Sequence, residues 1–166
     1  MRSLIIPLIA LGLAGTPAAA LEVVTTASED FQEKLEDDYG VRELAFLQAK
    51  VEKSVTAAFE DSSAAPAMVK VELIDARPNR PTHEQLSDNP SLSFGSSFST
   101  GGAKLAGTAY NAAGEEIGSL EYKWYENDIR QAVGRSTWTD ANRAIRRFAT
   151  KLSKQVATST SAPESS

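Results

Sequence analysis

Two segments of the chain carry apolar residues at the three- and four-residue steps of an amphipathic helix. The first extends from Leu44 to Phe59 and the second from Trp138 to Val156. The apolar stripes consist of Leu44, Leu47, Val51, Val55, Ala58 and Phe59 in the first, and Trp138, Ala141, Ile145, Phe148, Leu152 and Val156 in the second. Thr137 precedes Asp140 by three positions, a spacing like that of a capping box, so we expect the second helix to begin there.

Four other segments have the alternation or the β-branched content of strands. They are Leu21–Thr26, Met68–Ala76, Ala103–Tyr110 and Glu116–Tyr125. The last two flank Asn111–Gly114, whose glycine can take the positive φ of a short hairpin loop. In the last strand, alternation places Leu120 and Trp124 toward the core and Lys123 on the side that faces water.

The order is strand, helix, strand, long loop, strand, strand, helix, with no internal repeat. It predicts an α+β fold, with a largely antiparallel sheet of about four strands and two amphipathic helices on one face. Residues 31–38 are ambiguous between helix and loop. Residues 77–101 contain three prolines and form a long loop, in which Ser91–Phe94 alternates briefly and could lie on a sheet edge.

The N-terminus has the three parts of a secretory signal peptide. A short positive segment, an apolar run and a stretch of small residues occur at Met1–Arg2, Leu4–Leu13 and Ala18–Ala20. The apolar run is shorter than the roughly 20 residues that cross a bilayer. We therefore predict a signal peptide over residues 1–20, with no membrane span after its removal. The exported chain is then a single domain over residues 21–157 with a disordered tail over 158–166, located in the periplasm or secreted.

Composition excludes several classes of chemistry. The 166 residues include no Cys and one His, and 17 Lys+Arg stand against 22 Asp+Glu for a net charge of −5. The absence of Cys excludes disulfides, thiolate metal sites, a thiol nucleophile and a lipid-carrying cysteine. The acidic balance argues against nucleic acid as a partner. Gly101–Gly102 lacks the pattern of a phosphate-binding or dinucleotide-binding loop, so we expect no cofactor and no metal.

Two arginines in the long loop are candidate ligand-binding residues. Arg77 and Arg80 each precede a proline, so a stiff extended backbone could present both guanidinium groups to a carboxylate or a phosphate. In the alternative interpretation, they pair with acids of the chain itself, for which Asp75 and Asp128 are the candidates.

The single histidine, His83, lies in the same loop. A hydrolase would pair it with Asp75 or Glu84 and a serine, but no nucleophile motif accompanies it. A solvated histidine in a short turn capped by Thr82 is the favoured interpretation. We assign Arg77, Arg80, His83 and Asp128 to a binding site and no residue to catalysis.

Charged and aromatic residues gather in three places. Residues 29–38 are acidic without the ligand pattern of an EF-hand, which indicates a solvated face. The outer side of the second helix carries Arg143, Arg146, Arg147, Lys151 and Lys154. This side could contact anionic lipid headgroups or lipopolysaccharide. Tyr122–Tyr125 could form an aromatic platform, but alternation favours a core role for Tyr122 and Trp124.

Four stretches carry a resemblance, namely Glu33–Gly40, Asp75–Thr82, Tyr122–Ile129 and Thr137–Asp140. Through them the chain resembles an uncharacterised family of exported proteins from Gram-negative bacteria, over most of the predicted domain. The resemblance implies export and a single domain, and it lends no catalytic residue because that family has no assigned activity. We expect a non-catalytic binding or envelope accessory module that acts on an unknown protein or envelope component. The alternative is a small hydrolase that uses His83.

Overall fold

Four strands form one sheet in the order β1-β2-β3-β4. The computed structural model describes residues 20–161. Along the chain the elements are β1 (Glu22–Ala27), α1 (Glu29–Lys34), the π-helical turn η1 (Leu35–Tyr39), α2 (Arg42–Glu60), β2 (Met68–Arg77), α3 (His83–Asp88), β3 (Gly102–Tyr110), β4 (Glu116–Tyr125), the 3₁₀ turn η2 (Ile129–Ala132) and α4 (Thr139–Ser161). The predicted α+β class is confirmed.

The sheet is mixed because its first pair of strands is parallel. β1 pairs with β2 in parallel register, whereas β2–β3 and β3–β4 are antiparallel. The cause is the connection: the chain crosses from β1 to β2 through the long helix α2, and a crossover of this kind returns the second strand in the same direction as the first.

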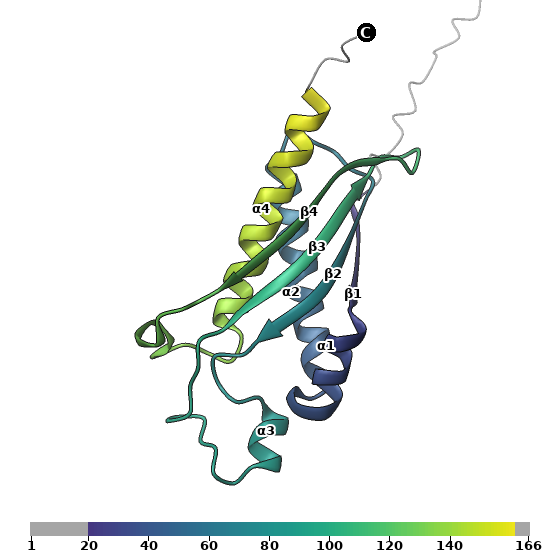
Figure 1. Cartoon of the computed structure of the whole chain (residues 1–166). Coiled ribbons are helices and arrows are strands. Elements are labelled where there is room, and N and C mark those ends of the chain that lie inside the picture. The colour runs from purple at the N-terminus through teal and green to yellow at the C-terminus, as the bar shows by residue number, and fades with distance from the viewer. Residues whose placement is uncertain (1–19, 162–166) are drawn as a thin grey trace, which may run out of the picture.

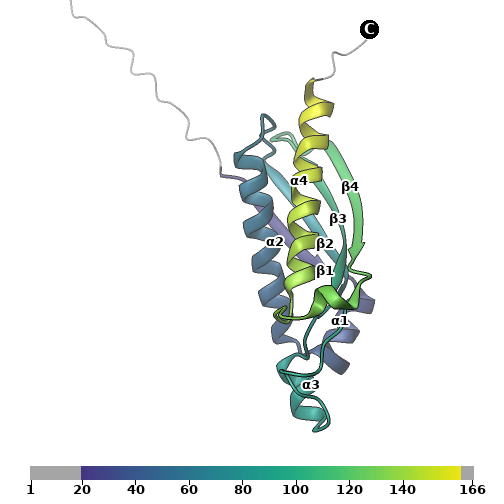
Figure 2. The same ribbon diagram turned by 90° about the vertical axis from the view of Figure 1, so that its left-hand side faces the viewer.

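Both long helices cover the same face of the sheet and lie side by side (Figure 2). Their buried stripes meet the inward side chains of the strands in one core, which includes Phe31, Leu47, Val55, Val71, Leu105 and Phe148. The other face carries polar side chains such as Lys70, Glu72 and Lys123, all exposed. One buried face and one wet face are typical of an open antiparallel sheet.

The predicted hairpin and its packing on the second helix are confirmed. Gly114 takes φ +80° in the turn between β3 and β4. Leu120 and Trp124 are partly buried against the core, while Lys123 between them is exposed. A Cβ on Gly107 of β3 would come within 2.5 Å of the ring of Phe148. The glycine therefore lets α4 pack closely on the sheet.

Three expectations about short segments change, two of them in residues 31–38 and 91–94 and the third at the end of the last helix. The ambiguous residues 31–38 form the last four residues of α1 and most of η1, and Phe31 and Leu35 are buried. Ser91–Phe94 does not lie on a sheet edge, because the backbone there closes turns, with Leu92 N–H donating to Asn89 O and Ser97 N–H to Ser93 O.

The last helix is longer than expected. It runs to Ser161, four residues into the predicted tail, and hydroxyls of Ser159 and Thr160 bond to carbonyls one turn back. Residues 1–19 of the predicted signal peptide and the remainder of the predicted tail lie outside the described residues.

Candidate functional site

Two loops meet at the end of the sheet where β2 ends and β3 begins (Figure 1). Residues 78–101 join these strands and include α3, and residues 126–138 join β4 to α4 and include η2. We name the two loops together the loop platform. The backbone N–H of Asn79 donates to Thr137 O at 2.6 Å, so the loops contact each other directly.

A buried amide–carboxylate pair anchors the loop platform to α4. Asn79 and Asp140 are both fully buried. The Asn79 amide donates to Asp140 Oδ2 at 2.6 Å, and its side-chain carbonyl accepts from the Asp140 N–H at 2.8 Å. The N–H of Gly101 donates to the same carboxylate oxygen at 3.3 Å. These hydrogen bonds tie both ends of the first loop to α4. Breaking them would leave buried polar groups without partners, which costs free energy. The expected capping pair of Thr137 and Asp140 is therefore wrong.

Arg80 joins the two loops. Its Nε donates to Arg135 O at 3.2 Å, and its Nη1 donates to Phe94 O at 3.0 Å and Gly95 O at 2.9 Å. The residue is 9% exposed, and its guanidinium carbon lies 5.2 Å from the centre of the Phe98 ring. Among residues 20–161, the structure thus pairs Arg80 with backbone carbonyls and not with an acidic side chain. By satisfying carbonyls of two segments, the guanidinium holds them in a fixed relation.

Arg77 lies at the end of β2 beside a tyrosine–carboxylate pair. Its guanidinium is 5.1 Å from the centre of the Tyr125 ring. Asp75 accepts hydrogen bonds from Lys34 Nζ at 2.7 Å and from the Tyr125 hydroxyl, so its ion-pair partner is Lys34 rather than an arginine.

The Asp75 contacts shift two pKa values. Burial alone would raise the pKa of Asp75, but the hydrogen bonds from Lys34 and Tyr125 and the positive charge of Lys34 outweigh burial, so this pKa lies below its ordinary value. Burial and the hydrogen bond to Asp75 raise the pKa of the Tyr125 hydroxyl. At neutral pH the cluster therefore contains an ionised carboxylate and a neutral phenol.

Among residues 20–161, His83 and Asp128 make no hydrogen bond or ion pair with Arg77 or Arg80. His83 is the first residue of α3 and is exposed, and Thr82 caps that helix in a capping box, as predicted. Within residues 20–161, no hydroxyl or carboxylate is hydrogen-bonded to its imidazole. Asp128 binds Arg130 at 2.8 Å, and hydrogen bonds from Arg130 hold the pKa of Asp128 below its ordinary value. Asp128 thus pairs with its neighbour along the chain rather than with Arg80.

A cavity of about 270 Å³ opens beside the first loop. Arg77 and Arg80 both line it, together with Tyr39, Phe98 and Asp38. His83 and Asp128 do not, so the structure brings two of the four predicted site residues together. Among residues 20–161, no group of three or more His, Cys, Asp or Glu is placed to hold a metal ion. No helix of that part is long and apolar enough to cross a membrane.

The loop platform exposes four large apolar side chains. Phe94 is 52% exposed, Phe98 41%, Ile129 50% and Val133 66%. The sequence pattern missed them, because they have no periodicity and lie among Ser, Gly and charged residues. A different feature of the sequence could have identified them. They are large apolar residues in segments that belong to no predicted helix or strand.

The chain matches no protein-family description and no curated protein. It is similar to a provisionally assigned lipoprotein from Caulobacter crescentus CB15, with 14% identity, a TM-score of 0.39 and coverage of 85% of this chain and 90% of that one. It is also similar to a minor lipoprotein from Acinetobacter baumannii, with 12% identity, a TM-score of 0.31 and coverage of 86% and 95%. Likenesses this distant assign no function to the chain.

Proposed function

We propose that the protein is an exported, non-catalytic module that binds a partner protein of the cell envelope through the loop platform. The observation that carries the proposal is the exposure of Phe94, Phe98, Ile129 and Val133 on two loops that Arg80 holds together. Large apolar side chains surrounded by polar residues are typical of the centre of protein interfaces.

The rigidity of the loop platform supports a binding role. Its loops are tied to α4 through Asn79 and Asp140 and to each other through Arg80. The loop backbone therefore needs little further ordering when a partner binds. Loops held by a rigid scaffold commonly carry binding function. A surface that is already ordered loses less conformational entropy when it binds, which strengthens association.

Export is the second part of the proposal. It is supported by the charged, apolar and small-residue segments of Met1–Ala20. Mass spectrometry of protein recovered from cells tests it: the mature form is expected to begin near Leu21. An intact Met1 in the mature pool would contradict both export and the choice of an envelope partner.

Site-specific photo-crosslinking in intact cells tests the binding surface. A photoreactive side chain at Val133 is expected to give an adduct of one defined mass, and the same group at Ala113, exposed in the hairpin turn at the other end of β3, is expected to give none. Phe94→Ser should remove the Val133 adduct without unfolding the protein, since Phe94 is exposed. Equal crosslinking from both positions, or no discrete adduct at Val133, would contradict the proposal.

A further inference from the structure

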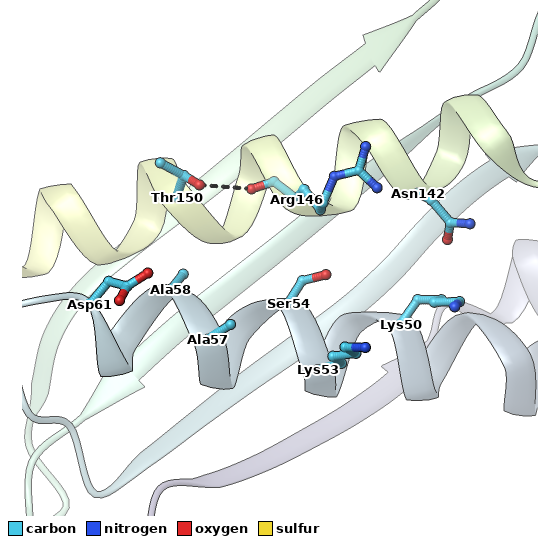
Figure 3. A pocket seen from close by; sticks show the side chains of 9 residues that line it. All are labelled: Lys50, Lys53, Ser54, Ala57, Ala58, Asp61, Asn142, Arg146 and Thr150. Atoms are coloured by element: carbon cyan, nitrogen blue, oxygen red, sulfur yellow. Dashed lines mark hydrogen bonds between the residues drawn. The ribbon is translucent and has the colours of Figure 1, made fainter.

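The two long helices leave a groove between them on the side away from the sheet. α2 and α4 run side by side in the same direction, and the space between them is about 450 Å³ (Figure 3). Lys50 and Lys53 of α2 and Arg146 of α4 line this groove, and Asp61 is its one carboxylate. The groove therefore carries a positive charge.

A second, shallower hollow continues this charge around α4. It measures about 620 Å³, shares Arg146 with the groove and contains no acidic residue. The cationic helix face, as we name the two hollows together, consists of Lys50, Lys53, Arg143, Arg146, Arg147, Lys151 and Lys154. Among the ion pairs of residues 20–161, only Arg143 of this set has an acidic partner, Glu126 at 3.7 Å. The other cations of this set have no ion-pair partner among the described residues.

Aromatic rings position several of these cations. The guanidinium of Arg147 lies 4.5 Å from the centre of the Trp124 ring, and the ammonium of Lys50 lies 5.1 Å from that of Phe46. Lys151 lies 5.7 Å from the Tyr122 ring. A ring face orders a cation without removing its charge, so these groups are held in place and can still bind an anion.

Part of the acidic charge gathers in a hollow separate from the cationic helix face. The net charge of the chain is −5, opposite in sign to the cationic helix face. Acidic residues gather at α1 and η1, where Asp30, Glu33, Asp37 and Asp38 line a separate hollow. A molecule with separated charges approaches an anionic surface with one side toward it.

We propose that the cationic helix face docks the protein on an anionic lipid bilayer, with the Lys and Arg side chains binding headgroup phosphates. Phe46 is 42% exposed beside Lys50, and an aromatic side chain next to basic residues is typical of helices that lie on the membrane interface. A planar bilayer touches only this side of the molecule. We favour a bilayer over a nucleic acid, because the chain as a whole is acidic, with a net charge of −5.

Vesicle binding by the full chain tests this proposal, which does not depend on the partner of the loop platform. The chain is expected to bind phosphatidylglycerol vesicles, to bind less at high salt, and to leave uncharged phosphatidylcholine vesicles largely unbound. The phosphatidylcholine vesicles control for apolar adsorption by the residues before Leu21. Replacing Lys50, Lys53 and Arg146 with glutamine should lower the phosphatidylglycerol affinity by about fivefold for each cation, or about 100-fold in all.

A matched triple variant tests whether the position of the removed positive charges matters, and not only their number. Lys70→Gln, Lys104→Gln and Lys123→Gln remove the same charge from the sheet face that the long helices leave uncovered, and they should lower the affinity less than fivefold. If the first triple variant fails to fold, Lys53→Gln with Lys154→Gln replaces it, because both side chains are exposed.

Three results would overturn the proposal. They are equal losses in the two triple variants, equal binding to charged and uncharged vesicles, and binding to a DNA duplex with none to phosphatidylglycerol.

Discussion

Replacing Arg80 by alanine removes the link between the two loops of the platform. Four backbone carbonyls, those of Phe94, Gly95, Ser97 and Arg135, then lose a charged donor that lies 3.0, 2.9, 3.5 and 3.2 Å away, respectively. A hydrogen bond to a charged group contributes about 1.5–3 kcal/mol, although released loop carbonyls regain water. We expect the free energy of unfolding to fall by about 2–4 kcal/mol, which is large against the roughly 5–15 kcal/mol of a typical domain.

Arg80→Lys tests whether the geometry of the hydrogen-bond donors matters in addition to the positive charge. A lysine keeps the charge, but its single ammonium cannot reproduce the fork that reaches both loops, so we expect it to recover less than half of the loss. Urea unfolding midpoints measure both variants, and amide hydrogen exchange over residues 94–99 should become faster in each. An alanine variant within about 0.5 kcal/mol of the native protein, with unchanged exchange in this segment, would refute the linking role.

Three further predictions concern the core, the carboxylate cluster and the histidine. Phe148→Ala deletes a fully buried ring and should cost about 3–5 kcal/mol in denaturant unfolding, whereas Lys123→Ala on the wet face should stay within about 0.5 kcal/mol. Because the folded-state pKa of Asp75 lies below its unfolded value, the stability that its charge contributes is complete above about pH 4 and is lost as the pH falls through the folded pKa; Asp75→Asn should flatten this acid limb of a stability–pH profile. His83→Ala should change stability by less than about 0.5 kcal/mol, and an esterase, phosphatase or glycosidase activity abolished by it would instead support the hydrolase.

Periodicity predicted the parts of the fold in which each residue's environment depends on its near neighbours along the chain. The stripe that contains Ile145, Phe148 and Leu152 is buried throughout, since a helix brings every third or fourth residue to one side. Alternation likewise placed Lys123 on the wet face, although Trp124 keeps part of its surface beside Arg147. The parallel pairing of β1 with β2 was missed, yet the strand, helix, strand order already favours it.

The loop platform could not be predicted in the same way, because its contacts join residues that are far apart in the sequence. Asn79 and Asp140 are 61 positions apart, and their pairing depends on how α4 returns to the end of the sheet. One of the two sequence interpretations paired Arg80 with an acid of the chain, because charge complementarity is the signal a sequence contains. Backbone carbonyls, present at every position, give no such signal, so the bonds to Phe94 and Arg135 appear only in the folded chain.

One helix fixes the relation between the two proposed surfaces. The first turn of α4 carries Asp140, which anchors the loop platform, and its later turns carry the cations from Arg143 to Lys154. The loop platform therefore lies at the end of the helix and the cationic helix face along its side (Figure 2). If the protein docks through that side, α4 lies along the membrane plane. The loop platform, at the end of α4, then points along the membrane surface rather than into it. Inserting the loop platform instead would desolvate the charged pair Asp128–Arg130. The two proposals are therefore compatible only if the apolar side chains of the loop platform stay outside the hydrocarbon.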